Sequence, residues 1–495
     1  MEKRKSSCQH ACAGILLSSV LLFLASAGVE GSEPVSQKAK DSQTTTAPPN
    51  EITVALKEMP VWQAHERVRG SFLAGQPSLE SPQGDSRIRY PALKSGTPLY
   101  GRIPGWYLPA VPRGGNGDDQ GGLAFVFDRS VDKSEGYDLL YFDENGDGDL
   151  ANDTPRGLLK DPPAGLSVKD GRPGRQTWFE PVKVTLPSPG GSPRVIELLP
   201  CTWTYKGRPP AVRFIPVQVH TGRFEVDGKS YEAFLGYEYV LSESLNEPST
   251  ALLLVSQDGK RASYLGVERL NTMPVLGRKY YRFSCTPAGD KLFVQRYDGR
   301  LGVLELSPGN RDIKRLEMMG ELQSRTAVIG IGYDRLDEKN MPQGVRRSEI
   351  PVGDYCPSYM TVSLGKVRFA FSDNYYQSAS GRTSSNPEAR YNIPIRADKP
   401  FVLGFSNKPV VTFVRSTSND RLYRGGEMKI EAVLVDPVLN IMIRRLDDMS
   451  RAEKKSYKMP DGQEMTYEEG ASLDPKVTIA RANGAIVTEG TMPFG

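Results

Sequence analysis

The sequence has few cysteines, few histidines and no marked excess of charge of either sign. Its 495 residues include 5 Cys and 3 His, and 63 Lys and Arg against 59 Asp and Glu give a net charge of +4. A net charge this close to zero gives no support for a nucleic-acid or other polyanionic partner, and we expect none. The scarcity of cysteine excludes a disulfide-rich scaffold. Because no CxxC pair occurs, thiol redox chemistry and zinc ligation by cysteine are not expected either.

Long apolar runs are also missing, apart from one near the amino terminus. Three basic residues at positions 3–5 precede an apolar run at 13–25, and Ala25-Ser26-Ala27 follows it. The run is shorter than the roughly 20 residues of a membrane span. A basic start, a short apolar stretch and small residues together predict a signal peptide at 1–27, with an uncleaved membrane anchor as the alternative. The mature product then has no membrane span and is periplasmic, extracellular or on the cell surface.

Groups that carry catalysis are sparse in the rest of the chain. His65 lies in HERVR without the second histidine of a zinc-protease motif, and His220 ends an apolar, strand-like run. No Walker, dinucleotide-binding or nucleophile-elbow motif occurs. Three cysteines remain beyond the signal segment, and nothing in their spacing decides which two would form a pair: Cys201, Cys285 and Cys356.

The pattern along the chain predicts a mainly β protein. Residues 28–55 form a polar, linker-like segment. Short β-type runs then recur about every 8–12 residues without helical patterns between them, which indicates antiparallel sandwich or barrel modules. We divide the chain into an N-terminal β domain at 56–205, a middle β domain at 206–391 and a C-terminal immunoglobulin-like sandwich at 392–495.

Turn-forming dipeptides mark several hairpins within this pattern. Asp227-Gly228, Asp258-Gly259 and Asn483-Gly484 each stand between two β-type runs. A further turn is predicted at 288–290. Such dipeptides favour two-residue hairpin turns, because both central positions of the turn need a positive φ.

One acidic stretch carries a specific chemical signal. In residues 143–154, DENGDGDLANDT, oxygen-bearing side chains recur at alternate positions around Gly148. This spacing matches the first half of an EF-hand loop, and calcium takes six to eight oxygen ligands. The candidate ligands are Asp143, Asn145, Asp147, Asp149 and Asp153. We expect a structural calcium ion, because a fully coordinated ion has no open position for a substrate.

The second half of the stretch departs from the EF-hand pattern. Thr154 stands where a bidentate Glu would be, and Pro155 prevents a normal helix start. Asp153 can supply the closing carboxylate, and Asp128, Asp132 or Asp138 can add a ligand from the preceding turn. The pattern therefore predicts a calcium loop between β elements. The alternative is an acidic turn without an ion, because Asn-Gly and Asp-Gly pairs also form plain turns.

Four stretches of the chain resemble sequence segments of uncharacterised secreted β-rich proteins of planctomycete-type bacteria, which carry a D-x-N-x-D-G-D-L acidic loop. They are residues 136–155, 349–374, 425–448 and 472–495. The resemblance implies export, β architecture and the acidic loop as a unit. It implies no substrate and no catalytic residue.

Together these features favour an exported, non-catalytic protein with a role in envelope or surface structure, or in recognition of a glycan or an envelope protein. The alternative is an extracellular hydrolase that cleaves glycans with a pair of carboxylates, because such pairs are made in space and not in sequence. The oligomeric state is not determined by the sequence.

Overall fold

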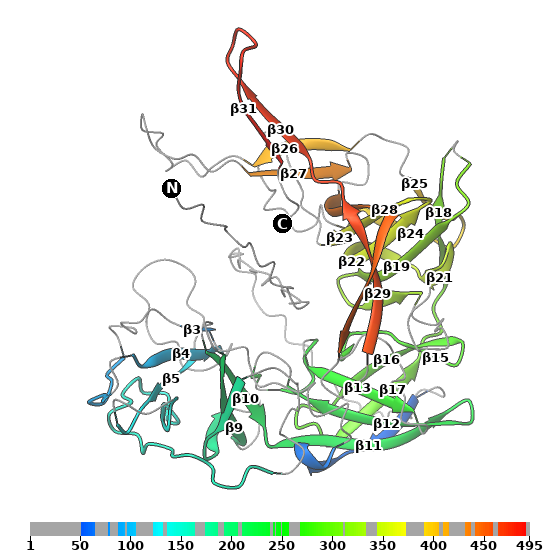
Figure 1. Ribbon diagram of the computed structural model, residues 1–495. Helices are drawn as coiled ribbons and strands as arrows, with labels where there is room; N and C mark the ends of the chain where they lie inside the picture. Colours follow the sequence, from blue (N-terminus) through cyan, green and yellow to red (C-terminus); the bar gives the residue numbers. More distant parts are fainter. Residues whose placement is uncertain are drawn as a thin grey trace, which may run out of the picture. The chain divides into compact units, whose positions relative to one another are not determined.

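The chain is built almost wholly of β-strands, as its computed structural model shows (Figure 1). Within the described residues the one other element is a three-residue 3-10 helix, η1 (Val61–Gln63). The mainly β, largely antiparallel architecture predicted from the sequence is confirmed. The structure describes residues 51–491 with gaps, the longest of which are 65–77, 80–87, 105–121, 164–173, 257–267, 333–343, 373–390 and 415–430. The predicted signal peptide at 1–27 lies outside the described residues.

Four sheets use the strands up to Arg296. The first has the order β1 (Glu51–Ala55), β17 (Lys291–Arg296), β16 (Lys279–Cys285), β15 (Val275–Leu276). The second has β10 (Ala211–Pro216), β9 (Arg194–Tyr205), β7 (Gly174–Trp178), with β8 (Val182–Leu186) also on β9. The third has β14 (Glu268–Arg269), β13 (Ala251–Ser256), β12 (Lys229–Gly236), β11 (Gln218–Val226), β2 (Lys57–Pro60). The fourth has β3 (Ser78–Leu79), β4 (Leu99–Pro104), β5 (Gly122–Asp128), β6 (Leu139–Phe142).

Three further sheets use the remaining strands. The three-stranded one has β21 (Arg347–Pro351), β18 (Leu301–Ser307), β25 (Phe401–Gly404), and its β18–β25 pair is parallel. The nine-stranded one runs β20 (Val328–Ile331), β19 (Leu316–Gln323), β22 (Gly353–Leu364), β23 (Val367–Ser372), β28 (Ile441–Lys458), β27 (Glu431–Asp436), β26 (Val410–Val414). In it, β24 (Ile393–Ile395) also pairs with β22, and β29 (Glu464–Ser472) with β28. The last sheet is a hairpin of β30 (Lys476–Ala480) and β31 (Ile486–Thr491).

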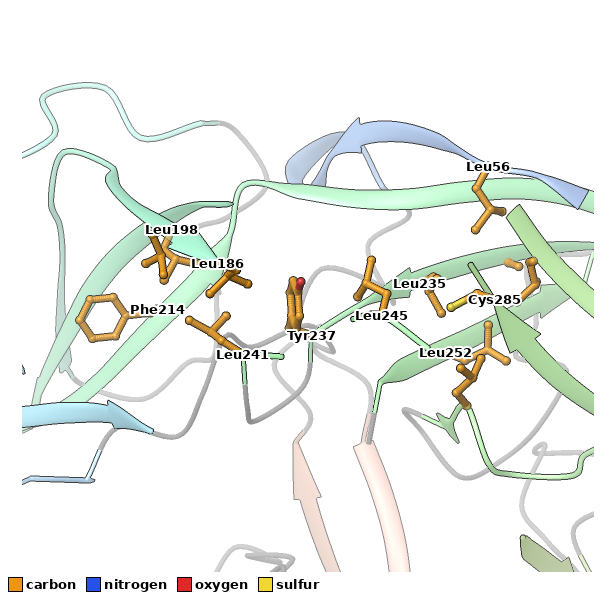
Figure 2. Close-up of a cluster of buried hydrophobic side chains, with 14 of the residues drawn as sticks. Leu56, Leu186, Leu198, Phe214, Leu235, Tyr237, Leu241, Leu245, Leu252 and Cys285 are labelled. Carbon is orange, nitrogen blue, oxygen red and sulfur yellow. The ribbon is translucent and has the colours of Figure 1, made fainter. Parts of the chain in front are cut away.

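Alternating burial explains why these segments form strands. In β19 every second side chain is buried, from Leu316 onward, and β8 alternates between buried and exposed from Val182. This period of two puts one face of each strand on the core and the other toward water. The largest core contains residues from all four of the first sheets described above. In Figure 2, Tyr237 stands between Leu186 and Leu241 on one side and Leu245 on the other.

The predicted domain boundaries do not coincide with breaks in the sheets. Residues 51–55 of the predicted linker form β1, because their apolar side chains pack beside β17. The boundary at 205/206 separates β9 from its partner β10. The boundary at 391/392 falls within the nine-stranded sheet, where β23 pairs with β28. Residues 49–495 form one compact unit. An immunoglobulin-like arrangement of the last strands stays a prediction.

Three of the predicted turns are observed. Asp227 and Gly228 both have positive φ values, 49° and 73°, as a two-residue hairpin turn requires. Gly289 joins β16 to β17, and Gly484 joins β30 to β31. The Asp258-Gly259 turn lies outside the described residues.

The three cysteines beyond the signal segment are all buried, and no disulfide joins any two of them: Cys201, Cys285 and Cys356. None of the helices in the described part of the chain is long and apolar enough to cross a membrane.

Candidate metal-binding loop

The acidic stretch forms a closed loop between two β segments. Leu140, in β6, and Arg156 exchange both of their backbone hydrogen bonds, with N···O distances of 2.9 and 2.7 Å. Asp143 begins the loop directly after β6, and its backbone N–H donates to the carbonyl oxygen of Ala124 in β5. Both ends of the loop are therefore fixed by β pairing and not by helices, in agreement with the strand-like entry and with Pro155 at the exit.

Asp143 is the buried centre of the loop. Its side chain is fully enclosed, and its two carboxylate oxygens accept the backbone N–H groups of Asp147 and Gly148, both at 3.1 Å. Burial raises the pKa of the Asp143 carboxyl, although the N–H groups of Gly148 and Gly146 oppose this shift. A carboxylate in such a position is stabilised by a nearby cation.

A chain of side-chain to backbone hydrogen bonds sets the curvature of the loop. Asn145 Oδ1 accepts the N–H of Asp147 at 3.0 Å, and Asp147 Oδ1 accepts the N–H of Asp149 at 2.8 Å. Asp149 Oδ1 in turn accepts the N–H of Ala151 at 3.0 Å. Each contact leaves a second lone pair on the oxygen. The side-chain amide of Asn152, above all, lowers the pKa of the exposed Asp147 carboxyl.

Packing at Leu150 fixes the far side of the loop. Leu150 is fully buried with Ile88, Ala124 and Val126, on the face of the β3–β6 sheet opposite the main core. Gly148 turns the backbone toward this cluster with a φ of 78°, a value that a residue with a Cβ rarely adopts. Next to it, Arg89 forms an ion pair with Asp149 at 2.9 Å.

Asp153 lies on the closing side of the loop with an unsatisfied oxygen. Its Oδ2 atom is buried and has no hydrogen-bond partner. Burial is the first cause that raises the pKa of Asp153 to about 6, and the charges of Asp143, Asp147 and Glu144 add to it. Three of the expected ligands therefore lie close enough for their charges to interact: Asp143, Asp147 and Asp153. Asp149 is engaged by Arg89, and Asn145 donates its amide to Asp147 at 3.0 Å.

Residues that the sequence pattern did not single out connect the loop to the neighbouring sheet. Glu144 accepts the guanidinium of Arg156 at 2.7 Å and the backbone N–H of Lys183, in β8, at 3.3 Å. Arg89 is the other such residue. The Glu144–Lys183 and Arg89–Asp149 contacts join positions 39 and 60 residues apart in the sequence, so no local spacing indicates them.

Two of the three acids considered in the preceding turn have other partners. Asp128 is buried and accepts the backbone N–H of Lys94 at 2.8 Å, and Asp138 accepts the backbone N–H of Ser130. Asp132 lies outside the described residues.

The side chains of the loop do not form a finished coordination sphere. In the part of the chain that the structure describes, no group of three or more His, Cys, Asp or Glu side chains is arranged to hold a metal ion. The oxygens of Asp143, Asn145, Asp147 and Asp149 instead accept N–H groups of the loop. The fit to calcium therefore rests on the chemistry of the donor set and on the unpartnered oxygen of Asp153.

A surface cavity of about 450 Å³ lies at β2, β11 and β12. Its lining includes the carboxylates of Glu58 and Glu232 and the cations of Lys57 and Arg223, but no aromatic side chain. Arg223 contacts Glu232 at 3.4 Å. Because one of the two acids is paired and no ring is present to stack on a sugar, this cavity adds no specific support for glycan hydrolysis.

No family model, curated protein or solved structure matches the chain. The resemblance to secreted planctomycete-type proteins stays a prediction.

Proposed function

We propose that this chain is an exported, non-catalytic β protein whose loop at 143–153 binds one structural calcium ion. Its wider role is in envelope or surface structure, or in recognition of a glycan or an envelope protein. The buried, unpartnered Oδ2 atom of Asp153, beside Asp143 and Asp147, carries the metal proposal. A buried polar atom without a partner is costly, and a bound cation would satisfy it.

The chemistry of the loop favours calcium over other cations. Its donors are carboxylate and amide oxygens, with no histidine or cysteine among them, and such donors suit calcium or magnesium. Magnesium requires a tight octahedron and keeps its waters, whereas calcium accepts more oxygens in a flexible arrangement. A loop held by exchangeable N–H contacts can adjust to calcium more easily.

Thermal unfolding of the purified protein in calcium and in chelator tests the metal proposal. A ligand that binds only the folded state stabilises it by about 2.7 kcal/mol at a hundredfold excess over its Kd. Calcium should therefore raise the melting temperature, and magnesium should raise it less.

The variant Asp147→Ala should abolish the calcium response, and isothermal titration should show no binding. Asp298→Ala is the matched control, because Asp298 is an exposed acid in the connection between β17 and β18, remote from the loop in sequence. Its response to calcium should equal that of the unchanged protein. Identical wild-type melting curves in calcium and in chelator would show that the loop is only an acidic turn.

Export has its own test, which is independent of the metal. If the signal peptide is cleaved after Ala27, amino-terminal sequencing of the released protein should begin at or near Gly28. An intact Met1 on the mature protein would contradict this part of the proposal and leave the metal site unaffected.

A further inference from the structure

The two edge strands of the nine-stranded sheet, β20 and β26, differ in whether other backbone covers them. At one end, β20 is covered: Val328 exchanges backbone hydrogen bonds with the segment 271–273, and its neighbours Ile329 and Ile331 are fully buried. At the other end, β26 pairs with β27 on one side only, among the residues described. Val410 and Val411 are 47% and 49% exposed there.

The sequence of β26, VVTFV, lacks most of the usual protections of an edge strand, apart from its short length and Pro409 directly before it. Natural edges are blunted by charged residues, proline or bulges, because an unprotected edge pairs with other strands. β26 has no charge and no proline, and its register with β27 is regular. An uncovered edge of this kind is suited to accept another strand.

The hairpin of β30 and β31, drawn in red in Figure 1, is the second element with an unpaired edge among the described residues. Every residue from Thr478 to Thr491 is exposed, and no third strand pairs with the hairpin in the described part of the chain. Its apolar side chains Ile479, Ile486 and Val487 are 40%, 60% and 58% exposed. An isolated two-stranded hairpin is marginally stable in water at best. This hairpin therefore gains stability if a sheet edge receives it.

We propose that two copies of this chain associate by exchanging these elements, so that the hairpin of each copy adds to the β26 edge of the other. A reciprocal exchange closes as a two-fold dimer and leaves no free copy of either element. The hairpin and β26 supply roughly 20 residues from each copy, near the lower limit of the 20–30 residues a side in a stable interface. A one-way contact would involve half as many and fall below that range.

Sedimentation velocity of the purified protein at several concentrations tests this exchange. We expect a concentration-dependent dimer. Val487→Asp alters the hairpin and Val411→Asp alters the edge, and each should raise the dimer Kd by roughly tenfold or more. Val195→Asp is the matched control, because Val195 is a 59% exposed valine on β9, which belongs to neither the hairpin nor the β26 edge. Circular dichroism confirms that each variant is folded.

Mixing the two variants separates this arrangement from others. The mixed pair keeps one intact contact, between the unchanged hairpin of one copy and the unchanged edge of the other. It should therefore associate more tightly than either variant alone. If hairpins instead paired with hairpins, mixing would restore nothing. A protein that stays monomeric at every concentration would overturn the proposal, whether its hairpin is free or pairs with its own sheet. A dimer whose Kd is changed by neither variant would also overturn it.

Discussion

Two Asp-Gly pairs, Asp147-Gly148 and Asp227-Gly228, have the same local sequence signal and very different surroundings. At Asp227-Gly228 both residues have positive φ and are exposed, and the flanking residues of β11 and β12 pair directly. At Asp147-Gly148 only the glycine has positive φ, and it is buried. β6 ends at Phe142, before Asp147-Gly148, so the chain there forms a wide loop around Asp143. An Asp-Gly pair thus favours a turn, while the neighbouring strands decide which kind.

Leu150→Ala, at the acidic loop, should cause the largest loss of unfolding free energy. Leu150 is fully buried beneath the acidic loop, and such truncations cost about 2–5 kcal/mol of unfolding free energy. Lys229→Ala, just after the other turn, removes an exposed side chain and should change stability by about 0.5 kcal/mol or less. Urea denaturation measures both values. Equal effects at the two positions would show that the acidic loop is no better anchored than a surface turn.

Asp143→Ala should have the next largest effect. The substitution leaves the N–H group of Gly148 without its acceptor, while that of Asp147 keeps Asn145 Oδ1, and one buried donor without a partner costs about 1–3 kcal/mol. Asp227→Asn keeps a residue that tolerates positive φ, so it should be close to neutral. Denaturation in chelator separates this loss from any loss of calcium. A neutral Asp143→Ala would mean that the buried carboxylate does not organise the loop.

The glycines of the two pairs should respond alike in stability and differently to calcium. Gly148→Ala and Gly228→Ala each place a Cβ at positive φ, 78° and 73°, which costs about 1–2 kcal/mol. Neither Cβ meets a severe clash, since the nearest atom to the first is Ile88 Cδ1 at 3.6 Å. Only Gly148→Ala should also reduce the calcium-induced rise in melting temperature. A reduced response in Gly228→Ala would place the ion elsewhere.

The smallest expected effect is on pH dependence. The folded-state pKa of Asp153 is raised to about 6, so the folded protein binds this proton more readily than the unfolded chain. In chelator, this group therefore adds stability as the pH falls from 7 toward 5. In calcium, protons compete with the ion and the calcium-induced rise should shrink over the same range. Asp153→Asn should remove both trends, and melting curves at pH 5, 6 and 7 measure them.

Much of the secondary structure could be predicted because it depends on neighbours in the chain. The alternation in β8 and the Asp227-Gly228 turn are local properties, and both are observed. The pairing of β23 with β28 across the predicted boundary at 391/392 could not be predicted in this way, because the paired positions are about 70 to 80 residues apart in the sequence. The polar composition of 28–55 likewise led to the prediction of a linker there. Residues 51–55 form β1 by pairing with β17, which is distant in the sequence.

The acidic loop shows the same difference between local properties, which could be predicted, and contacts between distant segments, which could not. The spacing of residues already shows that oxygen donors alternate around Gly148 and that Pro155 prevents a helix at the end of the loop, since spacing and ring chemistry are local. The burial of Asp143, the ion pair between Asp149 and Arg89, and the oxygen of Asp153 without a partner become visible in the folded chain alone. Burial and ion pairing depend on segments distant in the chain, and these distant contacts determine which carboxylates are left to face a cation.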